Sequence, residues 1–214
     1  MLQFTKDFEF IGDYSGPYAI LSHTWEKDEK AGYDKIRQFC RLAAVDGFSH
    51  GWVDTCCIDK ASSAELSEAI NSMFRWYKHV TRCYVYLADV PDCQGAEIND
   101  VHVKWQKLSP VDHPFFRSRW FSRGWTLQEL IAPFDLHFYS STWTAVAAKK
   151  DIVYPLSRIT GIGYHVLKNG DLSYVPVSER MRWASLRSTT RIEDTAYSLL
   201  GTFEVNLPLL YGEG

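Results

Sequence analysis

The run YAILSH (residues 18–23) gives the clearest strand signal in the chain. It follows a Gly-Pro turn and is apolar at nearly every position, as in strands that are buried on both faces of a sheet. Further along the chain, GWVDTCCI (51–58), CYVYLADV (83–90) and LHFYS (136–140) predict three more strands. Strands this apolar are typical of a parallel sheet covered by helices on both sides.

Helical patterns separate these strands. Residues 33–47 repeat apolar side chains at helical spacing and end at Gly47. Ser62 and Glu65 form a capping box in front of a three-turn apolar stripe. A third helix is expected from Arg123 or Gly124 to the residue before Pro133. Alternating strands and helices predict an α/β domain with right-handed crossovers.

After the fourth predicted strand the sequence pattern becomes mostly helical. Residues 143–164 suggest short helices, and Ser178 is expected to cap a helix that runs to about Arg187. Thr190 and Glu193 form a second capping box, for a helix ending at Gly201. We therefore expect one domain, residues 1–214, with a sheet core at about 15–142 and a mostly helical extension at about 143–214 that packs on it.

Composition excludes several classes of protein. The 214 residues carry a net charge of −3 and no long basic run, which argues against a nucleic-acid partner. No apolar run approaches the roughly 20 residues that span a bilayer, so no membrane role is expected. Five cysteines without framework spacing favour a reducing, cytoplasmic compartment, and the lack of any C-x-x-C predicts no structural metal site.

Ligands of open parallel sheets bind beyond the carboxyl ends of the strands. Ser22, His23 and Trp25 follow the first predicted strand, and Asp54 lies at the end of the second. These residues are our candidates for substrate binding. Each also has a structural interpretation: Ser22 as the end of its strand, His23 as a partner of a backbone carbonyl, Trp25 as a core residue, and Asp54 as a loop cap or the partner of an arginine.

The stretch RWFSRGWTLQELIAP (119–133) adds a carboxylate, Glu129, to aromatic rings and arginines. The alternatives are a solvated helix face for Glu129 and structural salt bridges for Arg119 and Arg123. A different chemistry, a nucleophilic Cys56 or Cys57 activated by His23, also fits the same edge of the sheet.

Four motifs in order carry a family resemblance: YAILSHTW, WVDTCCIDK, RWFSRGWTLQELIAP and TTRIEDTAYSLLGTFEVNLPLLYGEG. Over residues 18–214 the chain resembles the fungal heterokaryon incompatibility (HET) domain, with Glu26 and Lys60 in place of a common Gly and Gln. The resemblance implies a cell-death role in nonself recognition. It also implies an N-terminal position in a longer protein, ahead of downstream receptor domains.

HET domains are distantly similar to TIR domains, which implies a flavodoxin-like fold and cleavage of NAD+ by one glutamate. The TIR pattern S-x-W-C-x-x-E-L is similar to the segment from Ser122 to Leu130. The spacing from Ser122 to Glu129 is one residue longer than the spacing from Ser to Glu in the pattern. Without a gap, Gln128 would align with the pattern's glutamate. Glu129 would then be catalytic, with NAD+ or a related nucleotide as substrate and no cofactor.

The chemistry assigns roles to the neighbouring residues. The nicotinamide of NAD+ is already a cationic leaving group, so one carboxylate suffices to stabilise an oxocarbenium-like state. Trp25 and Trp125 suit stacking on that ring, and Arg123, or Arg119, suits the diphosphate. The alternative function is a non-catalytic signalling module that acts by self-association or through partners. Self-association is expected under either hypothesis, since the family resemblance implies a switch.

Overall fold

The computed structural model describes residues 1–4, 9–10, 14–24, 29–92 and 113–212. Its centre is one seven-stranded sheet of order β2-β1-β4-β3-β5-β6-β7. The strands are β1 (Leu2–Gln3), β2 (Glu9–Phe10), β3 (Ala19–His23), β4 (His50–Trp52), β5 (Arg82–Tyr86), β6 (Leu136–Tyr139) and β7 (Ala145–Ala148).

The four central strands, β4, β3, β5 and β6, are parallel, as the sequence predicts. Ala19 and Ile20 pair with both neighbours of β3, and both side chains are fully buried. The outer strands β1, β2 and β7 pair antiparallel, so the sheet is mixed and not purely parallel. It therefore reaches beyond the expected 15–142 core at both ends.

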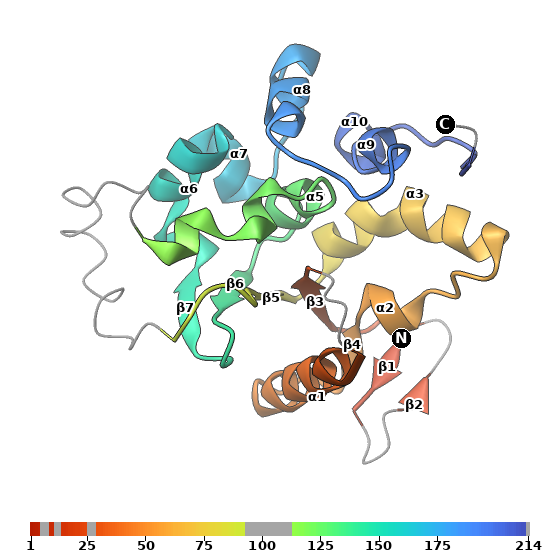
Figure 1. Ribbon diagram of the computed structural model, residues 1–214, viewed down its shortest axis with the longest axis vertical. Coiled ribbons are helices and arrows are strands. Elements are labelled where there is room, and N and C mark those ends of the chain that lie inside the picture. The colour runs from red at the N-terminus through yellow and green to blue at the C-terminus, as the bar shows by residue number, and fades with distance from the viewer. Residues whose placement is uncertain (5–8, 11–13, 25–28, 93–112, 213–214) are drawn as a thin grey trace.

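Helices cover both faces of this sheet (Figure 1). One helix, α1 (Glu29–Val45), packs Phe39, Cys40 and Ala43 against one face. The other face carries α3 (Ser63–His79), α5 (Thr126–Ile131) and the helices of the C-terminal third. Those helices are α6 (Val153–Thr160), α7 (Tyr164–Asn169), α8 (Val177–Ser185), α9 (Asp194–Tyr197) and α10 (Leu200–Phe203).

The capping box ahead of α3 forms in a modified way. The Ser62 side chain accepts a hydrogen bond from the Glu65 N–H, as predicted. Glu65, however, accepts from the N–H of Asp59 at 2.8 Å. The carboxylate thus fixes the loop before the helix, and the helix start is set by two side chains.

Several predicted elements differ from the structure. The strand expected at 51–58 ends at Trp52, and a helical turn, α2 (Asp54–Cys57), follows. Residues 145–148, expected within short helices, form β7 because they pair with β6. Pro176, not Ser178, precedes α8, and the helix expected to end at Gly201 is split into α9 and α10.

Short 3-10 turns complete the connections: η1 (Pro114–Arg117) and η2 (Arg119–Ser122) lead into α5, and η3 (Lys149–Asp151) follows β7. In the part of the chain that the structure describes, no helix combines the length and the apolar character needed to cross a bilayer.

Candidate functional site

Glu129 is buried beside the carboxyl end of β3. It lies in the first turn of α5 and is 7% exposed, so the interpretation as a solvated helix face is wrong. The hydroxyl of Ser22, in β3, donates to Glu129 Oε2. The Trp120 ring donates from Nε1 to Ser22 Oγ at 2.8 Å. Because Trp120 supplies that donor, the Ser22 hydroxyl proton is directed at the carboxylate.

Burial controls the charge of this carboxylate. Desolvation raises the pKa of Glu129 to about 7, and the nearby Asp54 carboxylate pushes it in the same direction. Hydrogen bonds from Ser22 and Tyr77 and the charge of Arg187 oppose that rise. The ionised and neutral forms are therefore close in free energy at neutral pH, which suits a group that works in proton transfer or charge stabilisation.

Arg187 brings a cation to the site from the C-terminal third. Its Nη1 donates to the carbonyl of Arg123 at 2.9 Å and to Thr126 Oγ1 at 2.8 Å. Desolvation lowers the pKa of Arg187 to about 10, while the charge of Glu129 favours its protonated form. Arg187 thus joins the start of α5 to the carboxylate that α5 carries.

A second polar pair lies next to Glu129. His23 Nε2 is 3.3 Å from Asp54 Oδ1, and the two side chains are 3% and 29% exposed. Burial alone would raise the pKa of Asp54, but the hydrogen bond and charge of His23, together with Lys60, lower it. The environment therefore favours the ionised form of Asp54 and the neutral form of Glu129, which separates the pKa values of the two carboxyls.

The structure brings together only part of the predicted set. Ser22 and Glu129 are in contact, and His23 and Asp54 form the adjoining pair. Trp25 lies outside the described residues. Arg123 takes part through its backbone carbonyl, and Trp125 stands at the start of α5, half-buried against the core.

Arg119 and Cys57, two other candidates from the sequence, make contacts outside the site around Glu129. The Arg119 side chain pairs with Asp89 at 3.5 Å, and its N–H donates to the same carboxylate, which is the structural salt bridge considered above. Cys57 accepts at its sulfur from the Val53 N–H, whereas His23 faces Asp54. The sequence-based hypothesis did not include Tyr77, Arg187 or the Trp120 ring among the site residues. Tyr77 gave no signal, because it sits in the apolar stripe of α3.

Comparison with known proteins identifies the family. The profile of a family described as "Heterokaryon incompatibility protein (HET)" matches residues 18–129, which include β3, the His23–Asp54 pair and Glu129. The chain is 46% identical over 213 residues to "Vegetative incompatibility protein HET-E-1" of Podospora anserina. That alignment covers 92% of this chain but 15% of the relative. No solved structure matches the chain. Because the profile matches more than half of the residues, the chain belongs to the heterokaryon incompatibility (HET) family.

Proposed function

We propose that this chain is the cell-death effector domain of a fungal nonself-recognition protein and that it cleaves NAD+ at the nicotinamide–ribose bond. One observation carries the enzymatic part. A buried carboxylate, Glu129, lies at the carboxyl ends of the parallel strands, with a pKa of about 7 and hydrogen bonds from Ser22 and Tyr77. Perturbed carboxylates of this kind concentrate at functional sites.

Family membership supports the biological part. The family description refers to heterokaryon incompatibility, and the name of the relative refers to vegetative incompatibility. This chain spans about 15% of that relative. The proposed role is therefore that of one domain, acting in cytoplasm with further domains of a longer protein.

Strand order supports the TIR-like part of the proposal. In chain order, the four parallel strands lie as second, first, third and fourth across the sheet. Flavodoxin-like sheets have this order, and their ligands bind at the switch point between the first and third strands. Here that point lies between β3 and β5. Ser22 is near the end of β3, and Glu129 faces it.

The proposed mechanism needs Glu129 ionised. Nicotinamide leaves as a neutral molecule when the C–N bond breaks, and positive charge develops on the ribose. The carboxylate of Glu129 would stabilise that charge and accept hydrogen bonds from the ribose hydroxyls. Ser22 and Tyr77 would hold the carboxylate in position. Water would then attack the anomeric carbon and release a proton. Trp125 and Arg123, which precede α5, would contact the ring and the diphosphate.

Glu129→Gln tests this proposal, because it keeps the shape of the side chain and removes its charge. Nicotinamide release from NAD+ would be followed by chromatography at pH 8, where the wild-type carboxylate is ionised. A loss of about 3 kcal/mol of transition-state stabilisation lowers the rate more than a hundredfold. The matched control is Asp34→Asn, an exposed acid on α1.

The result has three informative outcomes. Release by wild type and Asp34→Asn, with none by a folded Glu129→Gln variant, supports the enzyme. Equal release by all three proteins rules out Glu129 as the catalytic residue. Only 7% of Glu129 is exposed, so the ribose must displace neighbouring side chains to reach it. A wild type that releases no nicotinamide favours a non-catalytic signalling function.

The second candidate is a self-associating signalling module, and the surface around α8 favours it. Val177 and Met181 lie about one turn apart on this helix and are 63% and 51% exposed, and Tyr174 just before it is 92% exposed. Exposed apolar residues grouped in this way are typical of association surfaces. Val177→Ser/Met181→Ser should lower the mass measured by light scattering at high concentration if α8 mediates association. An unchanged mass would remove α8 as the interface.

A further inference from the structure

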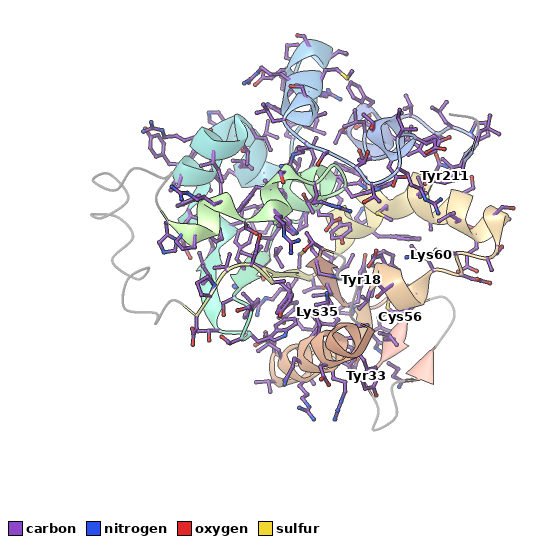
Figure 2. The ribbon with its side chains drawn as sticks, in the orientation of Figure 1. Tyr18, Tyr33, Lys35, Cys56, Lys60 and Tyr211 are labelled. Atoms are coloured by element: carbon purple, nitrogen blue, oxygen red, sulfur yellow. The ribbon has the colours of Figure 1, made fainter. Side chains whose placement is uncertain are left out.

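A cavity of about 900 Å³ has a lining that does not include Glu129. It is bounded by α2, by residues of α3 from Ala64 to Trp76, and by the β4 side of the sheet. Neither Glu129 nor Ser22 lines it. Tyr18 and Cys56, both labelled in Figure 2, are on its wall. Its volume is in the range of sites that hold drug-sized molecules.

Aromatic rings form much of this wall. Trp52 and Trp76 lie side by side with ring centroids 5.2 Å apart. The Tyr18 hydroxyl donates to the Trp76 carbonyl at 2.6 Å, which fixes the tyrosine ring, and Tyr14 stacks on His50 at 3.9 Å. Burial raises the pKa of Tyr18 to about 12, so the ring stays neutral. The wall therefore offers aromatic rings that are held in place.

The charged groups of the cavity are mostly acids. Asp59, Glu65 and Glu68 line it, and among the described residues no lysine or arginine does. The Asp59 and Glu65 carboxylates are held by hydrogen bonds, from the Ala61 N–H at 2.9 Å and from the Asp59 N–H at 2.8 Å. The amino group of Met1 adjoins the cavity near Cys57 and is the counter-charge among the lining residues. An acidic surround of this kind disfavours a phosphate-bearing ligand.

We propose that this cavity is a binding site for a flat organic cation, separate from the site around Glu129. Aromatic faces attract cations through their negative quadrupole, and carboxylates at the rim add Coulomb attraction. A neutral ring would gain only the stacking, and an anionic ring would be repelled. The inference does not depend on NAD+ cleavage, because none of its residues takes part in that proposal.

The cavity contains its own reporter. Cys57 lines it, and its sulfur accepts a hydrogen bond from the Val53 N–H at 3.4 Å, an arrangement that favours the thiolate. Cys40 and Cys83 are buried at 1% and 0% exposure and serve as internal references. A ligand in the cavity should slow alkylation of Cys57 and leave the two references unchanged.

The test uses one ring in three charge states. Iodoacetamide labelling of Cys57 would be followed by mass spectrometry at pH 7.5 with 1-methylnicotinamide (a cation), nicotinamide (neutral) or nicotinate (an anion). We expect protection by the cation at about fivefold lower concentration than by nicotinamide, and none by nicotinate. Equal protection by all three, or no protection by the cation, would overturn the proposal.

Variants locate the binding. Asp59→Asn/Glu68→Gln keeps the Asp59 side-chain acceptor and all the rings, and it should remove the preference for the cation. Asp34→Asn, on the other face of the sheet, should retain it. Glu129→Gln should retain it too, which separates this site from the NAD+ proposal. A preference that survives in Asp59→Asn/Glu68→Gln, or disappears in Glu129→Gln, would place the cation elsewhere and refute the assignment.

Discussion

Replacing Glu129 by Gln should change how stability depends on pH, whatever the chain catalyses. Burial raises the pKa of this carboxyl from 4.5 to about 7, so the folded state keeps a proton that the unfolded state releases. Each pKa unit corresponds to about 1.4 kcal/mol, and the shift therefore costs wild type about 3 kcal/mol once both states are ionised.

The direction of the effect follows from proton binding. Below pH 4.5 both states are protonated and Glu129 imposes no penalty. Between pH 4.5 and about 7 the folded state binds more protons, so the free energy of unfolding of wild type falls as pH rises. The glutamine side chain of the variant does not titrate, and the variant escapes this loss. Its stability relative to wild type should rise by about 3 kcal/mol between pH 4.5 and 8.

Thermal or urea unfolding from pH 4.5 to 8 measures this difference. For a chain of this size, 3 kcal/mol corresponds to a relative change in melting temperature of about 6–12 °C. Asp34→Asn, which changes an exposed carboxylate, should show only a small pH-dependent difference. A gap between Glu129→Gln and wild type that stays constant over this range would refute the buried, titrating carboxylate. The catalytic role assigned to it would lose its physical basis as well.

Three further outcomes follow from the same contacts. Ser22→Ala removes a donor that stabilises ionised Glu129, so in the same titration the upper end of the pH range over which stability is lost should rise by about one unit, while the lower end stays at the pKa of the unfolded state. A hydrogen bond from the adjacent thiol lowers the pKa of Cys57 to about 7, and iodoacetamide at pH 7 should label Cys57 before any buried cysteine. Gly201→Ala would overlap a phenylalanine of α3 and should cost about 1–3 kcal/mol in urea unfolding, whereas Gly32→Ala, with open space in α1, should cost nothing.

The sequence predicts elements well where local pattern and tertiary environment agree. The run before His23 is a buried strand in any context, and Ser62 caps α3 as its position indicates. The run at 51–58 misleads, because apolar residues lie on both sides of Asp54 and Thr55, and a run this short fits a strand or a helical turn. Only the structure shows the change at Asp54, which puts its carboxylate beside His23.

The strand β7 illustrates a second limit. Its residues, Ala145–Ala148, include three alanines, and alanine favours helices. Pairing with β6 overrides that preference, and no local signal reports the pairing. The site is limited in the same way. Strand order places Ser22 and Glu129 at the edge of the sheet. The hydrogen bonds of Arg187 to the start of α5 depend on how the C-terminal third packs, which no local pattern reports.

The candidate site does not end where the family profile ends. The profile match stops at residue 129, within α5. Yet the Gly124 N–H donates to the Ser188 carbonyl at 2.8 Å, and the Ser188 N–H donates to the Ser122 carbonyl at 2.7 Å. These two bonds hold the turn before α5 against the C-terminal third, and the neighbouring Arg187 reaches the same turn and the charge of Glu129. Since a buried carboxylate is stabilised by fixed donors and a nearby cation, Arg187, which lies beyond the matched segment, adds to the environment that sets the pKa of Glu129.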